Sequence, residues 1–234
     1  MPFTPAPPAS LAAFVLIVAA VLGTIVVGVY VAHRRLGLPA GRRTAAVHVG
    51  LLVWVALTSI PVATGLLAAS PMPRIPLYFA AINLAAVAFA FSRLGRALTL
   101  GLPLAALVAF QAFRLPLEFV LHGWADRGVI PPTMTWTGQN FDIVTGLLAL
   151  LLAPFANRSH TVAWAFNLIG LALLLNVMRV AMMSSPLPFA WPNVCPPLQL
   201  VLHLPHAWIG SVCVASALAG HIVLTRALLA RRAA

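Results

Sequence analysis

Three ionisable residues occur at helical spacing inside an apolar stretch of this sequence. Arg114, Glu118 and His122 occupy positions i, i+4 and i+8, so a helix through them would place all three on one face. An ionisable side chain at membrane depth is costly, and it usually faces a partner or a water-filled cavity. The spacing leaves two interpretations open: a structural ion pair between Arg114 and Glu118 that fixes helix packing, or a functional polar site.

Later apolar runs contribute further polar residues that could join this face. Asn140 and Asp142 open a short apolar run, where they could simply cap a helix. Asn176 and Arg179 lie one turn apart in the next run, and His206 opens the last one. The candidate binding residues predicted from the sequence are Arg114, Glu118, His122, Asn140, Asp142, Asn176, Arg179 and His206.

The charges within this group allow a closed network. The sequence has only three acids, and two of them, Glu118 and Asp142, belong to the group. Pairing Arg114 with Glu118 and Arg179 with Asp142 would neutralise it. An open pocket would instead favour an anionic guest, such as a carboxylate or a lipid phosphate, because arginine binds these groups through two parallel hydrogen bonds.

The runs that must position these residues are long and apolar. Of the 234 residues, 62% are hydrophobic and 7% are charged, and the mean hydropathy is +1.02. This composition fits a polytopic helical membrane protein and no soluble class. We therefore expect an all-α transmembrane helical bundle that forms a single domain, 1–234, with about seven spans. The predicted spans are 10–32, 45–69, 76–92, 97–123, 140–156, 161–184 and 206–229.

The positions of the arginines predict the orientation in the membrane. All fourteen basic residues are arginines, and they cluster at the ends of apolar runs, so the net charge of +11 indicates topology rather than nucleic-acid binding. With the amino terminus outside, only Arg74 and Arg127 are external. We expect a multi-pass protein of the cell inner membrane, with a retained first span and a cytoplasmic carboxyl terminus. The arginines predicted to be cytoplasmic are Arg34, Arg35, Arg42, Arg43, Arg93, Arg96, Arg158, Arg226, Arg231 and Arg232.

No metal or other cofactor is predicted. His203 and His206 could join the first motif as metal ligands, but a His-x-x-His pair across a proline is a weak pattern. His48 and His221 could form the axial pair of a b-type haem, although single buried histidines are more often packed and hydrogen-bonded. A retinal Schiff base is excluded because the sequence has no lysine.

The second half of the chain resembles a widespread group of uncharacterised bacterial integral membrane proteins. The resemblance is carried by Arg-Leu-Pro-Leu-Glu at 114–118, Met-Thr at 134–135, Gly-x-Asn-Phe-Asp-Ile at 138–143 and Gly-His at 220–221. It implies no activity.

A fainter resemblance is to the exosortases and archaeosortases, which are membrane transpeptidases. The Asn-x-x-Arg on one of their spans is matched by Asn-Val-Met-Arg at 176–179, and their later external histidine could be His203 or His206. Their nucleophilic cysteine precedes the arginine span, whereas Cys195 and Cys213 both follow it in this chain.

These observations predict an integral inner-membrane protein with a polar pocket on the external side. We expect it to act as a binding or accessory component of a membrane assembly. The alternatives are an exosortase-like transpeptidase or protease, in which Arg179 and a histidine handle charge on a carbonyl, and a small-solute or proton transporter. The expected partners are membrane lipid, an anionic ligand and other membrane proteins.

Overall fold

A computed structural model describes residues 3–231 of the chain. These residues form helices and loops and contain no strand. The longer helices are α1 (Pro8–Arg35), α2 (Gly41–Ala63), α4 (Pro71–Phe91), α8 (Ile143–Ala156), α9 (His160–Ser184) and α10 (Ala215–Ala230). The shorter ones are α3 (Leu66–Ala69), α5 (Arg93–Gly101), α6 (Leu104–Ala109), η1 (Phe110–Phe113), α7 (Arg114–Ala125), η2 (Pro132–Met134), η3 (Leu200–Leu202) and the π-helical η4 (Ile209–Val214).

Within residues 3–231, six helical stretches are long and apolar enough to cross a membrane. The chain is therefore an α-helical, multi-pass membrane bundle, as predicted. Helices are the expected solution because lipid offers no hydrogen-bond partners, so each spanning segment must satisfy its own backbone groups. The remaining predicted span is the shorter apolar helix α8. The six stretches are Pro8–Arg35, Gly41–Ala69, Pro71–Phe91, Leu104–Ala125, His160–Ser184 and Ile209–Ala230.

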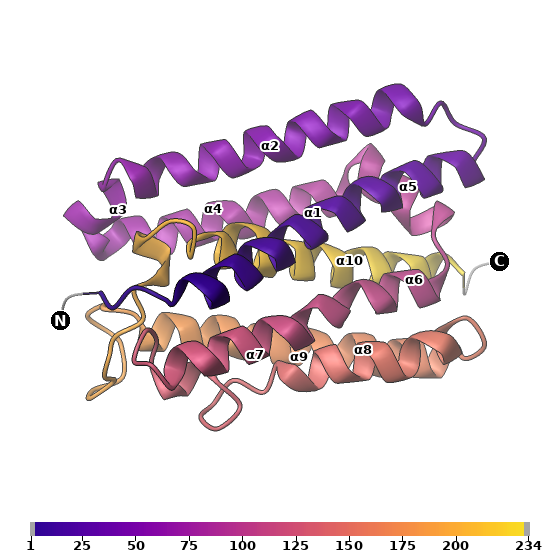
Figure 1. Cartoon of the computed structure of the whole chain (residues 1–234). Helices are drawn as coiled ribbons and strands as arrows, with labels where there is room; N and C mark the ends of the chain where they lie inside the picture. The colour runs from indigo at the N-terminus through magenta and orange to yellow at the C-terminus, as the bar shows by residue number, and fades with distance from the viewer. Residues whose placement is uncertain (1–2, 232–234) are drawn as a thin grey trace.

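The helices lie side by side, and α1 begins at the end of the bundle opposite to that where α10 finishes (Figure 1). The turns between α1 and α2 and between α8 and α9, together with α5 and the end of α10, gather at one end. We call it the arginine-rich end, because these segments hold every arginine predicted to be cytoplasmic except Arg232, which is outside the described residues. The opposite end, with α3 and the segments 126–142 and 185–208, is called the loop end.

The predicted span 97–123 is wrong in its first part. Helix α5 ends at Gly101, Leu102 is extended (φ −100°, ψ 143°), and a new helix begins after Pro103. Proline has no N–H to donate and disfavours helical geometry in the residue before it, so the apolar run is divided here. The membrane-crossing stretch is Leu104–Ala125, and α5 is a separate helix at the arginine-rich end.

Two other predicted spans also differ at their ends. The run 45–69 breaks after Ala63, because Gly65 has a positive φ of 70° and starts the separate turn of α3. The run 140–156 becomes helical only at Ile143, since Asn140 belongs to the preceding loop. Because Asn140 lies in this loop and not in α8, its side chain can contact residues of α7, as described below.

Candidate functional site

Arg114 is buried near the middle of the bundle. It is the first residue of α7, about halfway along the stretch Leu104–Ala125, and only 1% of its surface is exposed. Its Nε lies 2.7 Å from Oδ2 of Asp142, which immediately precedes α8. This contact is the only ion pair within residues 3–231.

The predicted pairing of Arg114 with Glu118 is therefore wrong, and so is that of Asp142 with Arg179. An arginine placed one turn before an acid is the less favourable order on a helix, whereas α8 approaches α7 unusually closely. A Cβ atom added at Gly146 would lie 2.4 Å from the backbone nitrogen of Leu115. Only glycine permits this close approach of α8 to Leu115. The approach brings Asp142, one turn before Gly146, to the guanidinium of Arg114, the residue that precedes Leu115.

Glu118 is held by the loop that precedes α8. The side-chain nitrogen of Asn140 donates to both carboxylate oxygens of Glu118, at 3.0 and 3.1 Å, and lies 3.0 Å from the carbonyl oxygen of Met134. The Asn140 side-chain oxygen accepts the backbone N–H of Asp142 at 3.0 Å. Asn140 thus links the two buried carboxylates, Glu118 and Asp142, which are 2% and 5% exposed.

A second branch of polar contacts runs from Arg114 toward the arginine-rich end. Nη1 of Arg114 lies 3.2 Å from Nε2 of His221 on α10, and Nδ1 of His221 lies 2.9 Å from the side-chain oxygen of Asn167 on α9. Asn167 donates to the hydroxyl of Thr225 at 2.7 Å. A Cβ atom at Gly170 would lie 2.5 Å from the His221 ring, so this glycine makes room for the imidazole.

These contacts form one buried polar network that connects α7, α8, α9 and α10. The network lies between two apolar clusters, one represented by Leu107 and Phe166 and the other by Leu117 and Leu174. We define the network as Glu118, Asn140, Asp142, Thr145, Arg114, His221, Asn167 and Thr225.

A small cavity borders the network on the loop-end side. Its accessible volume is about 110 Å³, and its polar wall is formed by Arg114, Glu118 and Asp142, while most of the other lining residues are apolar. Nη2 of Arg114 is buried and has no hydrogen-bond partner within residues 3–231. A cavity of this volume accommodates a few water molecules or a small polar guest that could accept from Nη2.

Asn176 and Arg179 lie outside this cavity and hold the loop instead. Asn176 donates to the carbonyl oxygen of Gln139 at 2.7 Å, and Arg179 contacts the Gln139 side chain at 3.5 Å. The guanidinium also stacks 5.3 Å above the ring of Trp191. These contacts tether the residue next to Asn140, so the pair positions the site from outside and contributes no group to the cavity wall.

His122 and His206 also lie apart from the network. His122 stacks on Trp136 with the ring centroids 4.0 Å apart. His206 is 4% exposed and packs 5.2 Å from Phe3 and 5.0 Å from Trp124. Of the eight predicted residues, the structure brings together Arg114, Glu118, Asn140 and Asp142.

The comparisons place the chain in a family. The family model described as Domain of unknown function (DUF8737) matches residues 72–229, which is more than half of the sequence. The chain belongs to this family. No curated protein and no solved structure matches the chain. The matched range includes every residue of the network, whereas α1 and α2 lie outside it.

Sequence reasoning did not place Thr145, Asn167, His221 and Thr225 in the candidate site. Each is a polar residue inside an apolar run, and this is the signal that would have pointed to them. It does not identify their partners, because His221 and Arg114 are separated by 107 residues in the sequence.

The structure also bears on the proposed capping and ligand roles. Asp142 occupies the position before α8 but makes no side-chain capping bond, since its carboxylate faces Arg114 and Thr145. Both ring nitrogens of His221 contact protein atoms, and His48 is exposed. No group of three or more metal-binding side chains occurs in the described part of the chain.

Arg179, the arginine of the Asn-x-x-Arg motif, contacts residues of its own helix and of two loops. Arg179 contacts Gln139, Asn176 and Trp191. His203 instead stacks on Phe3, with the centroids 3.8 Å apart, and Cys213 is buried at 1% exposure. His203 and His206, the two histidines that the resemblance suggested, pack against Phe3 and Trp124 at the loop end. We call these four residues the aromatic cluster.

The aromatic cluster makes a pH-dependent contribution to stability. Neither ring nitrogen of His206 has a hydrogen-bond partner in the described residues. Burial, together with the nearby His203, lowers the pKa of His206 to about 4, and burial also lowers the pKa of His203. Between about pH 6.5, where an unfolded histidine titrates, and pH 4, the unfolded chain binds a proton that the folded cluster does not.

We therefore expect stability to fall as the pH decreases through this range. The loss of stability caused by His206 should approach about 3 kcal/mol near pH 4. Thermal unfolding in detergent from pH 7.5 to pH 4 checks this expectation when the parent is compared with His206→Phe. The variant should lose much of the pH dependence, and an equally steep profile in both proteins would contradict the assignment.

Proposed function

We propose that the protein is a multi-pass inner-membrane protein that acts as a binding or accessory component of a membrane assembly. The cavity beside Arg114 is its binding site. Its guest is cationic, and the simplest such guest is a proton held at Glu118. The arginine count supports the inner-membrane orientation, with the loop end on the external side.

The composition of the cavity wall is the observation that carries this proposal. One guanidinium and two carboxylates line a cavity whose other walls are mainly apolar. Arg114 already pairs with Asp142 at 2.7 Å, so an ionised Glu118 would leave one uncompensated negative charge among mainly apolar walls. An uncompensated buried charge is strongly unfavourable, and a bound proton removes it.

The one positive and two potentially negative groups of the cavity wall favour a cation over the anionic guest expected from the sequence. That expectation required two arginines at one site, but Arg179 does not line the cavity. An added anion would face two carboxylates and a single arginine that is already paired. Membrane protein partners remain part of the proposal, because the role is that of an assembly component.

Infrared spectroscopy of the reconstituted protein tests the proton site. With only three acids in the sequence, the C=O stretch of a protonated carboxylic acid can be assigned by substitution alone. We expect this band at neutral pH in the parent and in Asp126→Asn, whose side chain is exposed. It should disappear in Glu118→Gln. A parent without the band, or a band that disappears only in Asp142→Asn, would contradict the proposal.

Proton transport is a second candidate function, which the length of the network favours. Hydrogen-bonded groups connect Thr225 to Asn140 through Asn167, His221, Arg114 and Asp142. Chains of this kind occur in the proton relays of pumps and transporters. Proton flux into vesicles that contain the protein, measured with a pH-sensitive dye, should then exceed that of empty vesicles and be lost in Glu118→Gln.

A further inference from the structure

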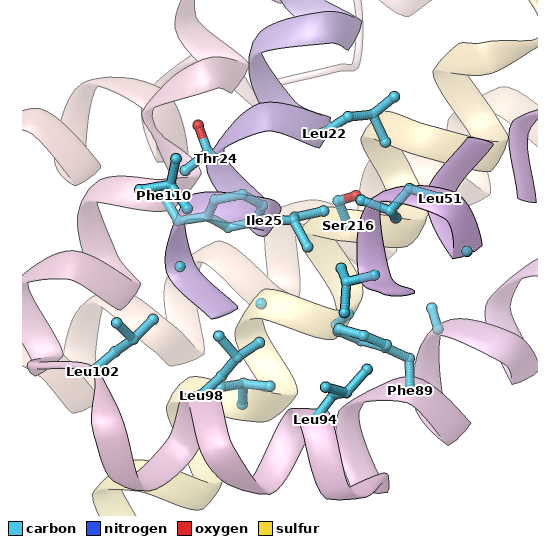
Figure 2. A pocket seen from close by; sticks show the side chains of 18 of the residues that line it. Leu22, Thr24, Ile25, Leu51, Phe89, Leu94, Leu98, Leu102, Phe110 and Ser216 are labelled. Carbon is cyan, nitrogen blue, oxygen red and sulfur yellow. The ribbon is translucent and has the colours of Figure 1, made fainter. Parts of the chain in front are cut away.

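A second, much larger cavity lies on the opposite side of α10 from the polar network. Its accessible volume is about 820 Å³, which falls within the range of ligand pockets in proteins. Its walls come from α1, α2, α4, α5, α6, η1, η4 and α10 and are almost entirely apolar. Figure 2 shows Leu51, Phe89 and Leu98, from three different helices, directed toward a common space.

The cavity exists because α2 packs mainly along α1 and diverges from the rest of the bundle (Figure 1). Hydrogen bonds fix the loop-end half of α2: Trp54 donates to the carbonyl oxygen of Ser211 at 2.8 Å, and Trp208 donates to the hydroxyl of Ser59 at 2.9 Å. Trp54 and Ser211 also line the cavity. The space therefore extends from this inner limit toward the arginine-rich end.

The length of the cavity corresponds to one leaflet of a bilayer. On α1 its lining extends from Leu22 to Arg35, and on α2 from Arg43 to Trp54. Thirteen and eleven helical residues span about 20 and 16 Å. Half of a hydrocarbon core of about 30 Å is about 15 Å, so the apolar part matches a lipid chain that begins at the arginine-rich surface.

Three arginines from three helices line the mouth of this cavity. Arg35 ends α1, Arg43 lies in the first turn of α2, and Arg93 begins α5. All three are exposed, and no side-chain hydrogen bond or ion pair within residues 3–231 involves them. By contrast, Arg226 and Arg231 at the same end donate to the backbone carbonyls of Ala90 and Leu102.

We infer that this cavity binds an anionic phospholipid from the leaflet at the arginine-rich end. One acyl chain occupies the apolar space, and the phosphate contacts Arg35, Arg43 and Arg93. The shape and the charge of the cavity both fit such a lipid, because its apolar walls are one leaflet deep and its three arginines lie at the level of the lipid head groups. The site is distinct from the cavity beside Arg114 and does not depend on the function proposed for it.

Lipid retention by the purified protein tests this inference. The protein is reconstituted in vesicles of phosphatidylcholine with a minor fraction of phosphatidylglycerol carrying the same chains, then extracted and washed in detergent. Mass spectrometry of the extract gives the moles of each lipid per mole of protein. We expect about one retained phosphatidylglycerol, with little phosphatidylcholine. Each arginine near an anionic phosphate contributes roughly a fivefold effect.

The chain offers a matched control for the charges. Replacing Arg35, Arg43 and Arg93 together with glutamine should lower phosphatidylglycerol retention at least about tenfold. The control replaces Arg34, Arg42 and Arg96, which belong to the same end but do not line the cavity, and it removes the same charge. Equal losses in both triple variants would show that only the general surface charge matters and would overturn the inference.

A second pair of variants tests the acyl chain without changing any charge. Gly50 lines the cavity, whereas Gly23 does not, and a Cβ atom at either position meets no other atom within 4 Å. Gly50→Leu should fill part of the cavity and reduce retention, whereas Gly23→Leu should leave it unchanged. Unchanged retention in Gly50→Leu, or equal retention of the two lipids by the parent, would overturn the inference.

Discussion

Replacing Asp142 with leucine is expected to cost about 3–5 kcal/mol of stability, the largest effect of any single substitution considered for this protein. The carboxylate of Asp142 neutralises Arg114, whose side chain is almost completely buried. Without it, the buried guanidinium keeps its charge but loses its closest partner. Arg114→Leu should be similarly destabilising, because it leaves the buried carboxylate of Asp142 without its compensating cation.

The double variant distinguishes an ion pair from two independent contributions. Because Arg114→Leu with Asp142→Leu removes both charges, it should recover at least about 1 kcal/mol relative to the sum of the single losses. Unfolding by a denaturing detergent in mixed micelles provides the measurement. Asp126→Leu is the matched control, since this acid is exposed and its loss should change stability by about 0.5 kcal/mol or less. Strictly additive single losses would contradict the coupling.

Gly146→Ala should also produce a large loss of stability, about 3 kcal/mol. The added Cβ atom would lie 2.4 Å from the nitrogen and 2.8 Å from the Cα of Leu115. Backbone atoms cannot move aside as the end of a flexible side chain can, so α8 must shift away from α7. Asp142 lies one turn from Gly146, and this shift would withdraw its carboxylate from Arg114.

The loss caused by Gly146→Ala should therefore be linked to the ion pair. In the Gly146→Ala background, Asp142→Leu should cost less than in the parent, again measured by detergent unfolding. Gly50→Ala is the control, since the added methyl group meets no neighbour and alanine favours a helix by about 1 kcal/mol over glycine. If Asp142→Leu costs the same in both backgrounds, the close approach at Gly146 does not position the ion pair.

The sequence by itself determined the class of the fold and the distribution of its arginines. An apolar segment in lipid has to form a helix, since its backbone groups find no other partners, so the long runs alone predict the spans. Most of the arginines lie at or beyond the ends of these runs, and their positions follow directly once the spans are known. Even the break at Pro103 has a local cause, although the continuous hydrophobicity of 97–123 concealed it.

The choice of candidate residues was also partly local, because a polar residue at membrane depth is conspicuous in any sequence. That rule identified Arg114, Glu118, Asn140 and Asp142, which do lie together. It equally included His122, Asn176, Arg179 and His206, which lie outside the network. Both groups contain an arginine and an asparagine beside or within apolar runs, so sequence patterns alone could not separate them.

Only the tertiary structure decided which polar groups meet. Partner choice depends on how far each helix is rotated and translated relative to its neighbours, and close contacts such as that of Gly146 with Leu115 set these quantities. Arg114 consequently binds Asp142 on another helix instead of Glu118 one turn away. The apolar cavity likewise depends on the divergence of α2 from the bundle, which arises from contacts between residues far apart in the chain, such as Trp54 and Ser211.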